Sequence, residues 1–194
     1  MTVTNVLIGG VGGQGAILSS ELLALAAIEF GQDVKQGEFH GVAQRGGAVF
    51  SHVRFGDRVD SPMARRESVD FMLALEKLEA LRYAHFVRPG GTIIVNDHKV
   101  EPVRTADHRD YPENAIDFLK SKGFKVIVIE ATQKAIELGN HRAANVVLLG
   151  ALAELLEIPD EVWNKILETR IPEKFRELNR AAFAAGREFA AQLS

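Results

Sequence analysis

A cluster of glycines directly after a short apolar run constrains the fold of this chain more than any other sequence feature. Residues 5–8 have the composition of a buried strand, and the apolar positions of residues 16–30 recur at helical spacing. Between them lies Gly10-Val-Gly-Gly-Gln-Gly15, which fits the pattern GxGxxG through Gly10, Gly12 and Gly15. The chain therefore opens with a strand, a tight glycine turn and a helix.

Strand-like and helix-like segments alternate through the first two thirds of the chain. The pattern predicts buried strands at residues 48–55, 69–75, 92–96 and 124–129, and helices at residues 76–85 and 114–122. Parallel strands need crossover connections, which such helices provide, so we expect a mainly parallel sheet with helices on both faces. Residues 56–66 and 98–113 are rich in turn formers and charges, which predicts surface loops.

The last third of the chain is predicted to be helical. Helical patterns at residues 132–138, 142–157, 160–168 and 173–192 are separated by Gly139, Pro159 and Pro172, and Asn140 is a candidate helix N-cap. The predicted fold class is therefore α/β and Rossmann-like, with a helical C-terminal third. Its 194 residues, 46% of them hydrophobic and 25% charged, favour one domain over residues 1–194.

Composition excludes several kinds of function. The sequence has no cysteine, which rules out a thiolate nucleophile and an iron–sulfur cluster held by cysteines of this chain. With 23 basic and 26 acidic residues, the net charge of −3 disfavours binding to nucleic acid. No apolar stretch approaches the roughly 20 residues that span a bilayer. We find no secretory signal, so the chain is expected to be soluble, intracellular and cytoplasmic, without a membrane partner.

The histidines and serines do not form recognisable catalytic patterns. No histidine pair has metal-ligand spacing, so no metal site is predicted, and no serine lies in a GxSxG elbow. His52 alternates with Phe50 and Arg54 along a predicted strand, which indicates a hydrogen-bonded residue of the sheet rather than a ligand.

The glycine turn has two interpretations. Glycines after a strand allow close backbone approach and leave the N–H groups of the next helix free for an anion, often a phosphate. A dinucleotide site also needs an acidic residue at the end of the second strand, but Asp33 comes early there and Glu38 comes late. Alternatively, the glycines only let the helix pack closely on the sheet. The candidate ligand-binding residues at this turn are Gly10, Gly12, Gly13, Gln14 and Gly15.

A second polar cluster follows the predicted second strand, at residues 38–47. It combines an acid, an imidazole, an amide, a guanidinium and three glycines, and we expect it to be a loop near the glycine turn. Arg45 has the geometry to bind a phosphate or carboxylate through two parallel hydrogen bonds. A solvated surface turn is the alternative. The candidate residues here are His40, Gln44, Arg45, Gly46 and Gly47.

Several spaced motifs together resemble one protein family over nearly the whole chain. These motifs are GVGGQG at residues 10–15, EFHGVAQRGG at 38–47, SHVR at 51–54, PGGTIIVND at 89–97 and NRAAFAAG at 179–186. They resemble the gamma domain of 2-oxoacid:ferredoxin oxidoreductases. Within that family, the HGxAQRGG form and the EALR segment at 79–82 are most similar to the small beta subunits that act on indolepyruvate.

The resemblance implies a division of labour between subunits. Such enzymes decarboxylate aryl pyruvates oxidatively with coenzyme A, giving an acyl-coenzyme A, carbon dioxide and reduced ferredoxin. Thiamine diphosphate and the iron–sulfur clusters are expected on a large partner subunit, which leaves this chain without a cofactor or catalytic residue of its own. We expect the chain to pack on that subunit and to help close the thiamine or coenzyme A site with both glycine-rich motifs.

Two other classes of protein fit the glycine turn alone. One is a self-sufficient oxidoreductase that binds NAD(P) or flavin, and the other is a non-catalytic nucleotide-binding scaffold. Arg45 likewise has two readings, since it could bind a phosphate or carboxylate or form a salt bridge between subunits.

Overall fold

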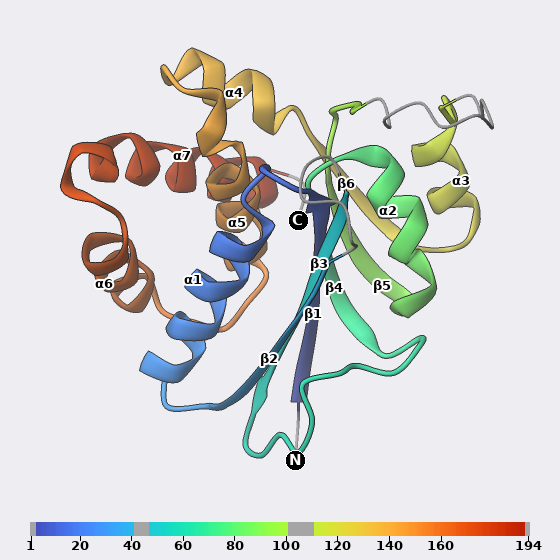
Figure 1. The fold of residues 1–194 in the computed structure, drawn as a ribbon, viewed down its shortest axis with the longest axis horizontal. Coiled ribbons are helices and arrows are strands. Elements are labelled where there is room, and N and C mark those ends of the chain that lie inside the picture. The colour runs from blue at the N-terminus through green and yellow to red at the C-terminus, as the bar shows by residue number, and fades with distance from the viewer. Residues whose placement is uncertain (1–2, 41–46, 101–110, 193–194) are drawn as a thin grey trace.

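Six strands form one sheet between two layers of helices (Figure 1). The structure is a computed structural model that describes residues 3–40, 47–100 and 111–192. The elements in chain order are β1 (Val3–Val11), α1 (Ala16–Glu29), β2 (Asp33–His40), β3 (Ala48–Gly56), β4 (Val69–Ala74), α2 (Lys77–Tyr83), η1 (Ala84–Phe86), β5 (Val87–Asn96), α3 (Ala115–Ser121), β6 (Lys125–Ile129), α4 (Ala131–Glu137), η2 (His141–Ala143), α5 (Ala144–Glu154), α6 (Asp160–Arg170) and α7 (Glu173–Ala191).

The strand order is β2-β3-β1-β4-β5-β6, and the sheet is mainly parallel, as predicted. Strands β1, β4, β5 and β6 run parallel, while β3 is antiparallel to both of its neighbours, β1 and β2. The expected α/β fold with a mainly parallel sheet is thus confirmed. Strand β3 is antiparallel to β2 because the sequence pattern between them predicts no crossover helix, and strands joined by a short connection pair antiparallel.

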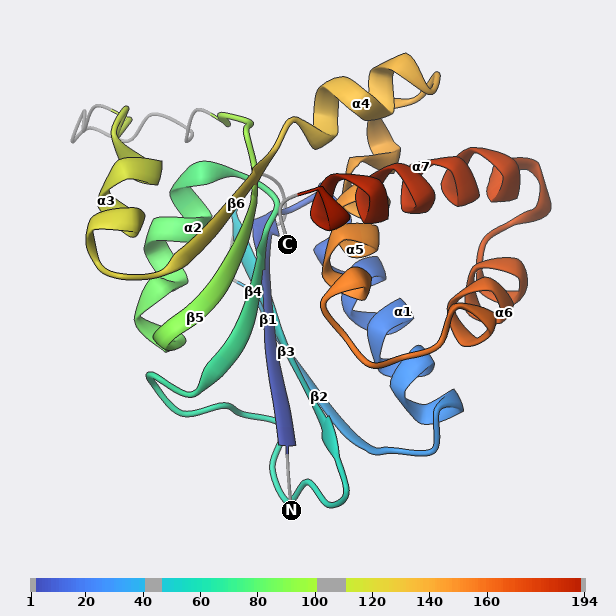
Figure 2. The same cartoon turned by 180° about the vertical axis from the view of Figure 1, so that it is seen from behind.

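Side chains alternate between the two faces of the sheet and so define two cores. Val6 and Ile94 point toward α1, α5, α6 and α7, whereas Leu7 and Ile93 point toward α2 and α3. All four side chains are completely buried. The view from behind in Figure 2 shows the same two helical layers on either side of the strands, which confirms the prediction of helices on both faces.

Helices α5 and α7 pack unusually closely, and glycines make this possible. A Cβ atom added to Gly150 would lie 2.1 Å from the carbonyl oxygen of Phe183, and one added to Gly186 would lie 1.8 Å from that of Val147. Each glycine therefore lies directly against the backbone of the other helix. This contact explains the small residues of the NRAAFAAG motif by packing alone.

The predicted segments agree with the structure to within a few residues, apart from three differences. Strand β5 begins five residues earlier than predicted, at Val87. The predicted helix at 76–85 divides into α2 and η1, and the one at 142–157 divides into η2 and α5, which ends at Glu154. Asn140 is the predicted cap, since its Oδ1 accepts a hydrogen bond of 3.0 Å from the Arg142 backbone N–H.

Arg54 of the SHVR motif holds the predicted loop after β3. Its guanidinium donates to the carbonyl oxygens of Ser61 and Met63, at 2.7 and 3.2 Å, and to Oδ1 of Asn5 at 2.6 Å. The loop is thereby fastened to the start of β1. Residues 101–110 of the second predicted loop lie outside the described residues.

Candidate functional site

The glycine turn joins the carboxyl end of β1 to the N-terminus of α1. Gly13 and Gly15 have φ angles of 100° and 86°, a left-handed conformation that favours glycine. The side chain of Gln14 closes the turn, because its Oε1 accepts a hydrogen bond of 2.8 Å from the Val11 N–H. Gly10 lacks room for a side chain, since a Cβ atom there would lie 2.8 Å from Cδ1 of Leu75.

Asn145 of α5 ties the C-terminal layer to this turn. Its Nδ2 donates to the carbonyl oxygen of Gly15 and to Oγ of Ser19, both at 3.3 Å, and its side chain is 3% exposed. A Cβ atom at Gly15 would lie 2.7 Å from that nitrogen. The sequence did not predict this residue, although one buried amide within an otherwise apolar helix was the available signal.

Gly47, the last residue of the second glycine-rich motif, lies beside the turn, as expected of that motif. The Gly12 N–H donates a hydrogen bond of 2.9 Å to the carbonyl oxygen of Gly47, which directly precedes β3. His40 is exposed at the end of β2, at the same edge of the sheet but two strands from β1, which is roughly 10 Å at ordinary strand spacing. Gln44, Arg45 and Gly46 lie outside the described residues.

One part of the predicted loop is wrong. Residues 38–40 were expected to follow the second strand, but they are its last three residues, and His40 is paired with Val49 of β3. Residues 38–40 alternate between exposed and partly buried positions, as in a strand. The many polar residues of this segment led to the prediction of a loop instead.

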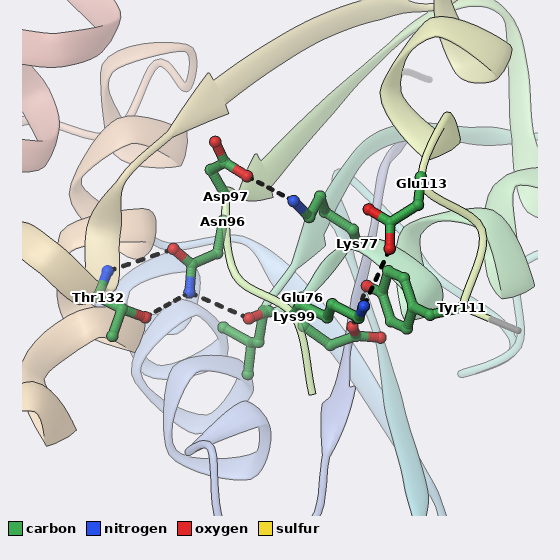
Figure 3. Close-up of polar contacts among 9 residues, drawn as sticks. Glu76, Lys77, Asn96, Asp97, Lys99, Tyr111, Glu113 and Thr132 are labelled. Atoms are coloured by element: carbon green, nitrogen blue, oxygen red, sulfur yellow. Dashed lines mark hydrogen bonds and ion pairs between the residues drawn. The ribbon is translucent and has the colours of Figure 1, made fainter. Parts of the chain in front are cut away.

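Asn96, at the carboxyl end of β5, connects three neighbouring segments. Its Nδ2 donates to the carbonyl oxygen of Leu75 and to Oγ1 of Thr132, at 3.2 and 2.8 Å, while its Oδ1 accepts from the Thr132 N–H at 3.2 Å (Figure 3). Asn96 is 2% exposed, so these bonds satisfy a buried amide. They fix the ends of β4 and β5 and the first turn of α4 relative to one another.

A second polar group lies beside Asn96, at the N-terminus of α2 (Figure 3). Glu76 is completely buried, and its carboxylate accepts hydrogen bonds from the Glu79 N–H at 2.6 Å and from the Tyr111 hydroxyl at 2.8 Å. Burial, together with this hydrogen bond to Glu76, raises the pKa of Tyr111. Lys77 forms an ion pair of 2.7 Å with Asp97. These contacts anchor the start of α2 beside the candidate site.

A cavity of about 530 Å³ opens among these elements, in the size range of small-molecule sites. It lies between the glycine turn, the ends of β4 and β5, and the starts of α4 and α5. Its lining residues are Gly13, Gln14, Gly15, Leu18, Leu75, Asn96, His98, Val100, Thr132, His141, Arg142, Ala144, Asn145 and Leu148. None of these is acidic, and Arg142 is cationic, so the cavity suits an anionic group.

The cavity divides the predicted site residues into two groups. Gly13, Gln14 and Gly15 line it, whereas Gly10, Gly12, His40 and Gly47 do not. Most of its polar lining was not predicted: Asn96, His98, Thr132, His141, Arg142 and Asn145. These side chains come from segments far apart in the sequence, and only the tertiary structure brings them together.

His52 differs from its predicted role as a hydrogen-bonded sheet residue. It lies in β3, but it is completely buried, and neither ring nitrogen has a hydrogen-bond partner in the part of the chain that the structure describes. Phe39, Phe50 and Phe86 surround it edge-on, with ring centroids 6.0, 5.6 and 5.0 Å away. Burial, and secondarily the charge of Arg54, lowers its pKa to about 4, which keeps the imidazole neutral.

The position of β3 argues against a dinucleotide site at the glycine turn. In such sites the acidic residue that binds the ribose ends the strand adjacent to the first one. Here β3 separates β1 from β2, so neither Asp33 nor Glu38 can take that place. Within the described residues, no three or more histidine or acidic side chains are grouped to hold a metal ion, and no helix is long and apolar enough to cross a membrane.

Comparison with known proteins extends over the whole fold. Residues 5–189 match the family described as pyruvate ferredoxin/flavodoxin oxidoreductase. The chain is 35% identical to the indolepyruvate oxidoreductase subunit IorB of Thermococcus kodakarensis, with 94% of this chain and 93% of that protein covered. It is 39% identical to IorB of Archaeoglobus fulgidus, with 94% and 92% covered.

A solved structure has the same fold. The gamma subunit of the keto/oxoacid ferredoxin oxidoreductase of Geobacter sulfurreducens superposes with a TM-score of 0.75 at 28% sequence identity, covering 97% of this chain and 99% of that one. The chain therefore belongs to the pyruvate ferredoxin/flavodoxin oxidoreductase family. Within the family it is a small subunit of the 2-oxoacid ferredoxin oxidoreductase type, similar to IorB and to the gamma subunits.

Proposed function

We propose that this chain is the small subunit of a thiamine diphosphate-dependent enzyme that oxidises aryl pyruvates, with indolepyruvate as the representative substrate. The reaction cleaves the bond between the carboxylate and the carbonyl carbon and releases carbon dioxide. The acyl group passes to the sulfur of coenzyme A, and the electron pair reduces ferredoxin. Similarity to IorB proteins at 35% and 39% identity supports this choice of substrate.

The composition of the chain supports the proposed division of labour. Clusters that carry low-potential electrons are commonly held by cysteine thiolates, and this sequence has no cysteine. We therefore assign the clusters and thiamine diphosphate to a large partner subunit, which also delivers electrons to ferredoxin. Residues 1–194 would act as one gamma-type domain on that subunit.

The observation that carries the proposal is the hydrogen bond between Gly12 and Gly47. It joins two glycine-rich motifs that lie far apart in the sequence, because Gly47, directly before β3, lies beside the glycine turn at the carboxyl end of β1. Backbone N–H groups in the first turn of a helix such as α1 favour an anion there. Both thiamine diphosphate and coenzyme A carry phosphate groups, and we propose that the two motifs form a surface that closes over one of them.

Arg45 is the residue that would make this closure specific. A guanidinium binds phosphate or carboxylate through paired hydrogen bonds, and the same geometry would serve a carboxylate of the large subunit. In either case Arg45 positions a ligand or the partner and takes no part in bond breaking. His40, Gln44, Gly46 and Gly47 would contact the same region.

Affinity purification of the chain from its host, with assays of iron and thiamine in the complex, tests the proposed function. We expect a large partner rich in cysteine that contains both. Recovery of the chain alone, with bound nucleotide, would instead support a self-sufficient NAD(P)- or flavin-binding protein. Recovery with a partner that lacks iron and thiamine would support a scaffold.

An Arg45→Ala variant of the complex tests the surface itself. We expect weaker binding of coenzyme A or weaker association of the subunits. Arg66→Ala is the matched control, because Arg66 is exposed in the loop after β3 and has no ion pair within the described residues. Unchanged turnover, coenzyme A affinity and subunit association in Arg45→Ala would contradict both roles.

A further inference from the structure

A second, smaller cavity adjoins the first one on the side of the C-terminal helices. It has a volume of about 180 Å³ and lies between α1, η2 and the start of α7. Leu18, Arg142 and Asn145 line both cavities, so the two share a wall. Gly12, which is hydrogen-bonded to Gly47 before β3, lines neither cavity.

Arg142 is the charged group at this shared wall. Its guanidinium is exposed and forms no ion pair or side-chain hydrogen bond within the part of the chain that the structure describes. The nearby arginines of α7 differ, because Arg176 and Arg180 are both paired with Glu168. Among the residues that the structure describes, no acidic side chain lines either cavity. The charge of Arg142 is therefore available to an anionic ligand, which a guanidinium binds in paired geometry.

The smaller cavity has the size and lining for one aromatic ring system. Its apolar wall includes Ile171, Pro172, Phe175 and Leu178. An apolar protein cavity of about 150 Å³ is known to bind benzene, so 180 Å³ is comparable with a single ring system. Phe175 is 39% exposed, and its ring already binds a cation, since Nζ of Lys174 lies 4.9 Å from the ring centroid.

One polar atom at this wall suits a ring that carries an N–H group. Asn179 donates its Nδ2 to the Phe175 carbonyl oxygen at 2.8 Å, so the hydrogen-bonding capacity that remains on this side chain includes the acceptor Oδ1. An indole N–H is a donor of the matching kind. Asn179 belongs to the NRAAFAAG motif. The packing of α5 on α7 explains the small residues of that motif but not its asparagine.

We infer that the two cavities together bind an aryl carboxylate, with its ring in the smaller cavity and its carboxylate on Arg142. This assignment rests on the proposed function, because the aryl 2-oxo acid of the reaction belongs to that chemical class. It gives the small subunit a part in choosing the aryl group. A nucleotide fits less well, since Arg142 borders the ring cavity directly and a nucleotide places a sugar between ring and phosphate.

Calorimetric titration of the full chain, in complex with its large partner, tests the inference. The probe is indole-3-acetate, which has no 2-oxo group to react, and indole and acetate serve as its separate halves. We expect indole-3-acetate to bind at least about tenfold more tightly than either half, because ring and anion then bind together.

Substitutions assign the binding to these cavities. We expect Arg142→Gln to weaken indole-3-acetate binding at least about tenfold, and Phe175→Ala to weaken it while leaving acetate unaffected. Arg170→Gln is the matched control, since Arg170 is also exposed and lies at the end of α6, outside both cavities. In turnover, Arg142→Gln should raise KM for the aryl 2-oxo acid and leave KM for coenzyme A unchanged.

Two results would overturn the inference without affecting the proposed function. One is an iron- and thiamine-containing complex that turns over but does not bind indole-3-acetate, or binds it equally well after Arg142→Gln. The other is adenosine 3′,5′-bisphosphate binding that depends on Arg142 and Phe175, which would assign the cavities to coenzyme A. Failure to recover such a complex would instead contradict the proposed function.

Discussion

The two helical layers bury their side chains against the sheet by different means. On the face of α1, α5, α6 and α7, the core is formed by closely packed apolar side chains, and every residue from Asn145 to Ala153 of α5 is buried. On the face of α2 and α3, the buried residues include ionisable groups. These are His52, Glu76 and Glu79.

Partners differ among the buried ionisable groups of the second layer. Glu76 is hydrogen-bonded to a backbone N–H and to the Tyr111 hydroxyl. Glu79 is paired with Arg82 through Oε1 at 2.9 Å, but its Oε2 is buried without a partner and burial raises the pKa of its carboxyl. Neither ring nitrogen of His52 has a hydrogen-bond partner among the described residues.

This difference means that the two layers respond to different perturbations. A close-packed apolar layer is sensitive to added volume, because backbones in contact cannot separate without losing packing. A layer with buried ionisable groups is sensitive to pH, because a proton that binds the unfolded chain better than the folded one opposes folding. Substitution and titration can therefore address the layers separately.

The largest expected effect is that of Gly186→Ala in the first layer. Its Cβ atom would lie 1.8 Å from the Val147 carbonyl oxygen, so α5 and α7 must move apart. We expect a loss of about 3 kcal/mol or more in the free energy of unfolding, measured with urea. Ala184→Ser, at an exposed position of the same helix, should change it by less than about 0.5 kcal/mol.

Acid should destabilise the second layer through His52. The pKa of this imidazole is about 4 in the folded protein and 6.5 in its ordinary state, so the unfolded chain takes up the proton first as pH falls. The free energy of unfolding should therefore decrease between pH 6.5 and 4, by roughly 2 to 3 kcal/mol at about 1.4 kcal/mol per pH unit.

A His52→Phe variant isolates this contribution. Urea unfolding at several pH values should show a weaker decrease across the interval from 6.5 to 4 than in the unsubstituted chain, since phenylalanine does not titrate. Parallel curves for the two proteins would show that the acid sensitivity comes from another group, and the distinction between the layers would then fail.

Two substitutions at the glycine turn, Gly15→Ala and Gly13→Ala, both introduce backbone strain, but only the first also brings a Cβ atom against a neighbouring side chain. Both positions have positive φ, but a Cβ atom at Gly15 would also lie 2.7 Å from Nδ2 of Asn145, whereas Gly13 faces open space. We expect losses of about 2 and about 1 kcal/mol, respectively, in urea unfolding. Equal losses would mean that Asn145 shifts freely, contrary to its hydrogen bond with Gly15.

The smallest expected effect is at the surface of the first layer. Lys165 of α6 forms an exposed ion pair of 2.5 Å with Glu29 of α1. Lys165→Met should reduce the free energy of unfolding by about 0.5 kcal/mol at low salt, and the difference should vanish at high salt. A salt-independent loss of more than 1 kcal/mol would show that the lysine stem contributes packing instead.

Much of the fold followed from local patterns in the sequence. Two strands were predicted correctly, from the apolar run before Gly10 and from the strand pattern at residues 69–75. The helix boundaries near Gly139 and Pro159 were also predicted correctly. These signals are local, because strand and helix periodicity and turn residues act within a few positions of one another. The pattern did not give the direction of β3, since direction depends on the length of a connection rather than on the strand itself.

The candidate site was only partly predictable. The turn residues Gly13, Gln14 and Gly15 were expected and do line the larger cavity. Arg142 and Asn145 were not, because nothing in their neighbourhood along the chain indicates that α5 starts beside the first turn of α1. Asn96 ended a predicted strand, yet its role became visible only through its bonds to Leu75 and Thr132.

The sequence by itself determined the class of the protein: an α/β chain that opens with a glycine turn, holds no cysteine and carries the spaced motifs of its family. Tertiary structure alone decided which residues share the site, since Gly12 bonds to Gly47, and Arg142 and Leu18 line one cavity, only after the sheet and helices have packed. The physical reason is range. Glycine conformation and side-chain periodicity act between neighbours in sequence, whereas cavities and buried hydrogen bonds form between neighbours in space.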